Sequence, residues 1–164
     1  MIRTGLAVTA LLALSACATA TAGTALDHPE ARSFAVSQDP SAQVDAALAS
    51  AAANDTRVLL VMGANWCHDS RAFAGWMEQP RFQALVAEHY ELVYVNVGMP
   101  QTADGHNLDV ARRFGLEAIY GTPTVLVLDS DGAALNLDTA GTWRNTASRS
   151  ADAIHAELTE LAAL

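Results

Sequence analysis

The chain has 164 residues, the length of one domain, and 51% of them are apolar, which is enough to form a hydrophobic core. Eighteen acidic residues against nine basic ones give a net charge of −9, and every basic residue is an arginine. This composition excludes a disordered chain and argues against nucleic acid as a partner.

The first sixteen residues have the pattern of a secretory signal peptide. Arg3 supplies the charged start, and the apolar run from Leu6 to Leu14 is too short to span a bilayer. The stretch Leu14-Ser15-Ala16-Cys17 resembles a bacterial lipobox, which implies cleavage before Cys17 and attachment of lipid to it. By the same resemblance, Ala18 implies an outer-membrane anchor on the periplasmic side of the cell envelope.

Ordinary signal cleavage is the alternative to this lipid anchor. The small residues Ala18-Thr19-Ala20 and Ala20-Thr21-Ala22 both fit a cleavage site that would release a soluble periplasmic protein. Residues 17–38 are small and polar and have no helical or strand period, so they predict a flexible tether. The folded domain is then expected over residues 39–164.

Helices and strands are predicted to alternate from Asp39 onward. Asp39 and Pro40 fit the start of a helix whose apolar face continues to Asn54. The run Arg57–Gly63 predicts a buried strand. The next expected elements are a helix from Cys67 to Glu78, a helical segment from Phe82 to Tyr90, a central strand from Glu91 to Val97, a loop from Gly98 to Asn107 and a short helix from Leu108 to Phe114.

The last third of the chain predicts a strand, a hairpin and a helix. Thr122-Pro123 opens a strand that continues to Leu128, and Asp129-Ser130-Asp131-Gly132 predicts a turn into an edge strand over Ala133–Leu137. A final helix begins after Ser148 or Ser150. Such alternation predicts an α/β sheet covered by helices on both faces.

The chemical centre is expected at the turn after the first strand. Cys67 lies there at the start of a helix, where unpaired backbone N–H groups and the helix dipole favour a thiolate over a thiol. Cysteines so placed can have a lowered pKa and react as nucleophiles. The competing interpretation is a buried structural cysteine.

Two motifs resemble the thioredoxin superfamily. Trp66-Cys67-His68-Asp69-Ser70 is similar to its Trp-Cys-x-x-Cys motif with Ser70 in place of the second cysteine, and Gly121-Thr122-Pro123-Thr124 is similar to its cis-proline loop. The resemblance covers roughly Pro40 to Leu164 and implies a thioredoxin-like three-layer α/β/α fold with a central mixed sheet of four to five strands. It also implies Cys67 as nucleophile and Trp66, Thr122 and Pro123 as substrate contacts.

Ser70 limits the chemistry that remains. A second thiol would release the mixed disulfide by attacking Cys67, whereas a hydroxyl forms no equivalent bond. The resemblance also implies a buried acid six residues before Cys67, but Val61 stands there. An external thiol must therefore complete any cycle, and a hydrogen bond from the Ser70 hydroxyl to Cys67 is one expected role.

His68 and Asp69 follow the nucleophile directly. Imidazole changes charge near neutral pH, so His68 is a candidate to stabilise the Cys67 thiolate. Asp69 is expected to face solvent or to pair with Arg71. The histidines are scattered and show no metal-ligand spacing, so neither a metal nor a cofactor is predicted.

Three functions stay open from the sequence. The first is single-cysteine thiol–disulfide exchange with protein or small-molecule thiols and disulfides, completed by an external reducing thiol or reductase. The second is a redox-inactive module that holds an extended peptide or partner in a groove between Trp66 and Pro123. The third is a sensor whose Cys67 is reversibly oxidised.

Overall fold

The computed structural model describes residues 28–36 and 39–164. The predicted signal peptide, the lipobox with Cys17, and the first part of the predicted tether lie outside these residues. No helix in the described part of the chain combines the length and the apolar character needed to cross a membrane.

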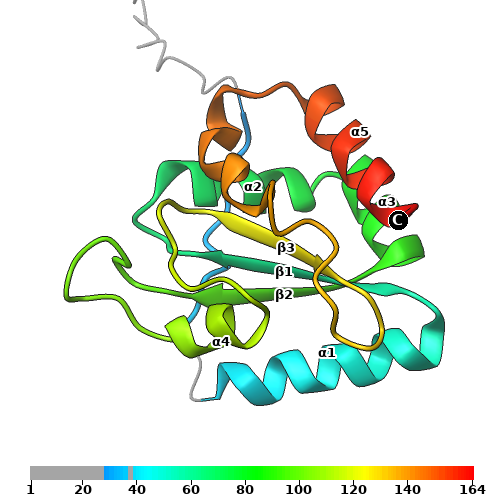
Figure 1. The fold of residues 1–164 in the computed structure, drawn as a ribbon. Coiled ribbons are helices and arrows are strands. Elements are labelled where there is room, and N and C mark those ends of the chain that lie inside the picture. The colour runs from blue at the N-terminus through cyan, green and yellow to red at the C-terminus, as the bar shows by residue number, and fades with distance from the viewer. Residues whose placement is uncertain (1–27, 37–38) are drawn as a thin grey trace, which may run out of the picture.

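A three-stranded mixed sheet lies at the centre of the fold (Figure 1). Its order is β2-β1-β3, where β1 is Arg57–Gly63, β2 is Tyr90–Asn96 and β3 is Thr124–Leu128. β1 pairs in parallel with β2 and antiparallel with β3. Six of the seven β1 residues are buried, because helices cover both faces of the central strand.

The helices form one layer on each face of the sheet. α1 and α4 cover one face, and α2, α3, η1 and α5 cover the other (Figure 1). Alternate β1 side chains enter the two cores: Val58 and Leu60 pack toward α1, and Leu59 and Val61 pack toward α2. The helices are α1 (Pro40–Asn54), α2 (His68–Met77), α3 (Pro80–His89), α4 (Leu108–Arg113), the 3₁₀ segment η1 (Ala140–Ser148) and α5 (Ala151–Ala162).

Helix caps confirm several predicted boundaries. α1 has its predicted bounds, and the Asp39 carboxylate accepts from the Ala42 backbone N–H at 2.8 Å. Ser150, rather than Ser148, caps α5 through a 3.2 Å bond from Ala153 N–H to its hydroxyl.

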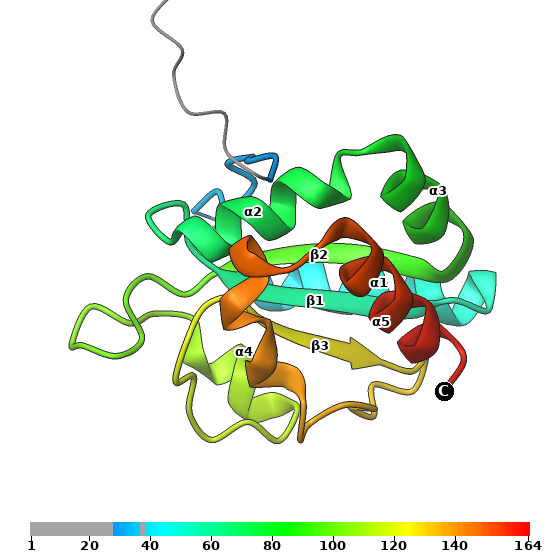
Figure 2. The same cartoon turned by 90° about the horizontal axis from the view of Figure 1, so that it is seen from above.

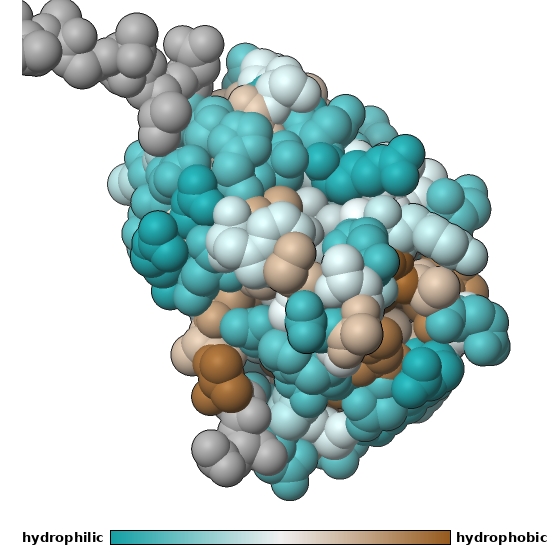
Figure 3. Space-filling view, turned by 90° about the vertical axis from the view of Figure 1, so that its left-hand side faces the viewer, coloured by the Kyte–Doolittle hydropathy of each residue, from teal (hydrophilic) through white to brown (hydrophobic). Residues whose placement is uncertain are grey.

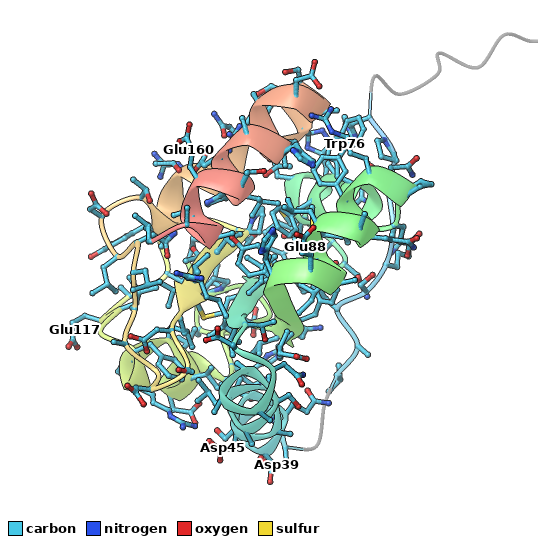
Figure 4. All side chains as sticks on the ribbon, turned by 90° about the vertical axis from the view of Figure 1, so that its right-hand side faces the viewer. Asp39, Asp45, Trp76, Glu88, Glu117 and Glu160 are labelled. Atoms are coloured by element: carbon cyan, nitrogen blue, oxygen red, sulfur yellow. The ribbon has the colours of Figure 1, made fainter. Side chains whose placement is uncertain are left out.

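The acidic side chains labelled in Figure 4, such as Asp45 and Glu160, project outward from the surface.

The predicted count of four to five strands is wrong for the described residues, which form three. Ala133–Leu137 is not a strand, although Leu128 and Ala134 form an isolated bridge. Asn136 replaces the expected strand: its side chain accepts from Val127 N–H at 2.8 Å and donates to the Val125 carbonyl at 3.0 Å. The amide thus occupies backbone groups that a neighbouring strand would pair.

The position of β2 differs from the prediction. A strand over Glu91–Val97 was predicted at the centre of the sheet, but β2 lies at an edge of the three described strands. β1 takes the centre, because β3 pairs on its other side. η1 was not predicted as an element, and it lies beside the start of α2 (Figure 2).

Residues 28–36, which the sequence analysis placed in a flexible tether, pack against the domain. We call this segment the N-terminal strap. Phe34 is 1% exposed and belongs to the core between the sheet and α2. The side chains of Asn65 and Asn96 both donate to its carbonyl at 3.0 Å. The tether prediction is therefore wrong for residues 28–36, because a single aromatic side chain anchors a stretch without periodicity.

Replacing Phe34 with Ala should destabilise the domain by about 3–5 kcal/mol, the usual cost of truncating a buried phenylalanine. Urea unfolding followed by circular dichroism measures this loss. Val36 is the matched control: it lies in the same strap but is 74% exposed, so Val36→Ala should change stability by less than about 0.5 kcal/mol. Equal, small effects of both substitutions would contradict the packed strap.

Candidate functional site

Cys67 lies at the N-cap position of α2, in the turn that follows β1. Its backbone is extended, with φ −78° and ψ 122°, so the helix begins with the next residue. The Cys67 N–H donates to the Ala64 carbonyl, and the Cys67 carbonyl accepts from Arg71 N–H, both at 3.1 Å. The side chain is 8% exposed. The predicted placement of Cys67 at the start of a helix is confirmed.

The Cys67 thiol contacts the Thr122-Pro123 loop. Sγ donates to the Thr122 carbonyl at 3.0 Å, and the peptide bond between Thr122 and Pro123 is cis. Thr122 is 5% exposed, and Pro123 is buried. The fold therefore brings together the two motifs that the sequence singled out, although 55 positions separate Cys67 from Thr122.

Ser70 is fully buried in the first turn of α2. Its hydroxyl accepts from the Ala64 backbone N–H at 3.4 Å. The hydroxyl also packs closely against Gly63, because a Cβ added to that glycine would lie only 2.7 Å from the same oxygen. The described residues include no hydrogen bond between Ser70 and Cys67. The hydroxyl therefore holds the turn that precedes Cys67 rather than the sulfur itself.

Asp69 does not face solvent or pair with Arg71, as the sequence analysis expected. One carboxylate oxygen accepts from the Ala147 N–H in η1 at 2.9 Å, and the other lies 3.7 Å from Nδ1 of His68. The prediction is wrong because it did not include η1, whose backbone supplies the partner. His68 itself remains exposed beside Cys67 and contacts the His28 ring edge-on at 5.4 Å between centroids.

Trp66 forms the exposed rim of the site. Its side chain donates from Nε1 to the Gly98 carbonyl at 2.8 Å, and the residue is 51% exposed. The bond joins the turn before Cys67 to the loop after β2. A large aromatic surface thus stays open to solvent one residue away from the thiol.

The polar network that fixes this turn was not predicted from the sequence. Arg71 donates to the carbonyls of Asn65 at 3.2 Å and Trp66 at 3.0 Å, and it forms a two-pronged ion pair with Glu30 of the strap. The Asn65 side chain bonds both the N–H and the carbonyl of Phe34. The strap and α2 therefore clamp the two residues that precede Cys67. The bonds to the strap join residues more than thirty positions apart, so local spacing gives no signal for them.

Comparison with known proteins agrees with this geometry. Residues 39–130 match the family described as thioredoxin-like, and this chain belongs to that family. The crystal structure of a disulphide isomerase from Xylella fastidiosa Temecula1 is similar, with a TM-score of 0.72 and 30% sequence identity. The match covers 80% of this chain and 97% of the isomerase. No curated protein matches the sequence significantly.

The pKa of Glu30 should make the strap contact depend on pH. The hydrogen bond from Arg71 lowers the pKa of Glu30 below its ordinary value of 4.5. Partial burial raises this pKa, and the positive charge of Arg71 lowers it further. Because the folded-state pKa lies below the unfolded one, ionised Glu30 stabilises the fold above pH 4.5. That contribution is lost as the pH falls through the folded-state pKa.

We therefore expect Glu30→Gln to lower the urea midpoint at neutral pH and to differ less from the wild type at about pH 3. Glu117→Gln is the matched control, because Glu117 is exposed and forms no ion pair with a described residue. A difference between wild type and Glu30→Gln that stays constant across this pH range would contradict the ion-pair account.

Proposed function

We propose that this protein performs single-cysteine thiol–disulfide exchange with Cys67 as its nucleophile. The observation that carries the proposal is the 3.0 Å hydrogen bond from Cys67 Sγ to the Thr122 carbonyl. This bond joins the cysteine motif to the cis-proline loop. Membership of the thioredoxin-like family and the 30% identity to a disulphide isomerase support the same reaction class.

The exchange takes place in two displacement steps. The Cys67 thiolate attacks one sulfur of a substrate disulfide, the substrate S–S bond breaks, and the second sulfur leaves as a thiolate with the bonding electrons. An external thiolate then attacks the mixed disulfide and releases Cys67. Ser70 cannot take this second role, because an alcohol forms neither the attacking anion near neutral pH nor a stable bond to sulfur.

The residues around the sulfur have distinct assigned roles. His68, exposed and adjacent in the chain, accepts the proton of the Cys67 thiol or stabilises its thiolate. Ser70 positions the turn through Ala64. When Cys67 becomes part of a mixed disulfide, the Thr122 carbonyl loses its thiol donor and can accept a substrate N–H. Pro123 and the exposed Trp66 ring would contact the chain on either side of the substrate sulfur.

We also propose that the protein acts in the cell envelope, anchored through lipid on Cys17 to the periplasmic side of the outer membrane. The support is the sequence Leu14-Ser15-Ala16-Cys17 after an apolar run. The sequence contains two cysteines, so lipid on Cys17 would leave Cys67 as the single reactive thiol. Cleavage beyond Cys17, which would give a soluble periplasmic form, leaves the same thiol.

A binding module without redox turnover is the second candidate. Two observations favour it: Ser70 stands where a resolving cysteine would be, and Val61, fully buried, stands where a buried acid would assist one. In this case the surface between Trp66 and Pro123 would hold an extended peptide without covalent chemistry.

Cys67→Ala separates the two candidates. The exchange proposal expects wild-type protein to form disulfide-linked complexes that are visible on a non-reducing gel, and it expects the variant to form none. The measurement is capture from an envelope extract, with Ser130→Ala as a control at an exposed surface hydroxyl in the turn after β3. Capture of the same partners at unchanged affinity by Cys67→Ala would instead support the binding module.

Ser70→Cys should supply the missing resolving thiol. We expect a mixed disulfide between Cys67 and a small peptide to persist in the wild type until a thiol is added, but to release its peptide spontaneously in the variant. Mass spectrometry over time measures the adduct. Ser70→Ala is the control, since it loses the bond to Ala64 without gaining a thiol. A variant adduct as long-lived as that of the wild type would contradict the proposed geometry.

A further inference from the structure

A small pocket lies between the first turn of α2, which follows Cys67, and η1. Its volume is about 340 Å³, and its lining residues are His68, Asp69, Arg144, Asn145, Ala147 and Ser148. His68 and Asp69 are the first two residues of α2 after Cys67, so the pocket borders the helix turn that Cys67 caps. Its size is at the small end of pockets that hold small molecules.

Arg144 connects this pocket to the other motif of the site. An added Cβ on Gly121 would lie 2.8 Å from Cδ of Arg144, so the arginine stem packs over Gly121. Gly121 precedes Thr122, the residue that accepts the Cys67 hydrogen bond. Arg144 also lines a second pocket of about 340 Å³ that includes Gly121 and Tyr120. The arginine side chain therefore lies along the edge of the reactive loop.

The charge of Arg144 is not paired within the described part of the chain. Arg71, Arg81, Arg113 and Arg149 each form an ion pair with a carboxylate, whereas Arg144 forms none. The acid in the same pocket is Asp69, which already accepts from Ala147 N–H and lies near His68. Arg144 packs over the loop that contacts Cys67, the only thiol of the described residues. In a protein of net charge −9, an unpaired cation there favours anions.

We propose that this pocket binds the carboxylate of a small anionic thiol or disulfide, with Arg144 as its cation. The inference rests on the proposed exchange at Cys67 and names the class of its small-molecule partner. The face that carries the start of α2 shows hydrophobic residues in separate places among hydrophilic ones (Figure 3). Such a mixed surface fits a small polar ligand better than a broad apolar partner.

The bound carboxylate would hold a disulfide sulfur near Cys67. The Cys67 thiolate attacks that sulfur, the S–S bond of the small molecule breaks, and its other half leaves as a thiolate with the electron pair. Arg144 forms no bond to sulfur in this step. It raises the local concentration of the anion and orients it, which increases the rate without changing the chemistry.

The test compares reaction rates of Cys67 with disulfides of different charge. The probes are 5,5′-dithiobis(2-nitrobenzoate), which carries carboxylates, neutral 4,4′-dithiodipyridine, and cationic cystamine. The kinetic phase that Cys67→Ala removes is assigned to Cys67. We expect Arg144→Gln to slow the reaction of Cys67 with the anionic probe. The expected factor is roughly three-fold, which Coulomb's law gives for the loss of one unit charge about 6 Å from the anion in water. The rate with the neutral probe should not change, and cystamine should react faster.

Arg112→Gln is the matched control, because Arg112 is exposed, forms no ion pair with a described residue, and lies on α4 at the opposite face of the sheet. It should leave all three rates unchanged, and added salt should remove the effect of Arg144→Gln. Equal slowing of every probe by Arg144→Gln, or no slowing, would overturn the anion site while leaving the exchange proposal intact. A Cys67 inert to all probes would overturn both.

Discussion

The hydrogen bond between the Cys67 thiol and the Thr122 carbonyl is the contact on which the site depends. Its origin is the pairing of β1 with β3. These strands are antiparallel, with Met62 opposite Thr124, so the end of one strand lies beside the start of the other. The turn after β1 and the loop before β3 must therefore meet at one edge of the sheet. α2 begins at the same place, with Cys67 as its N-cap.

Segments outside the central sheet hold this edge in place. The strap reaches Asn65 and Trp66 through Arg71 and Glu30, while η1 reaches Asp69 through the Ala147 N–H. Trp143 of η1 is fully buried and meets the Phe73 ring of α2 edge-on at 5.4 Å. Polar bonds thus fix the turn before the cysteine, and aromatic packing fixes the helix after it. His68 and Trp66, the two neighbours of Cys67 in the chain, remain exposed.

The sequence predicted the elements whose signals are local. Apolar periodicity and caps gave α1, β1 and α5, and two short motifs gave the cysteine and the loop that it contacts. The prediction failed where a single side chain, rather than a periodic pattern, decides the local structure. Phe34 anchors a stretch without periodicity, and Asn136 replaces a strand with its amide. Neither role has a spacing that could reveal it, and Asp69 was misassigned because its partner is a backbone N–H in the unpredicted η1.

The most direct test asks whether Cys67 reacts while the protein is folded, since its side chain is mostly buried. The full chain would be exposed to cystine in native buffer and in urea, and peptide mapping would separate Cys67 from Cys17. The account predicts a disulfide adduct on Cys67 in native buffer, formed at least as fast as in urea and reversed by dithiothreitol. An adduct that forms on Cys67 only after unfolding would identify a buried structural cysteine and contradict the proposed chemistry.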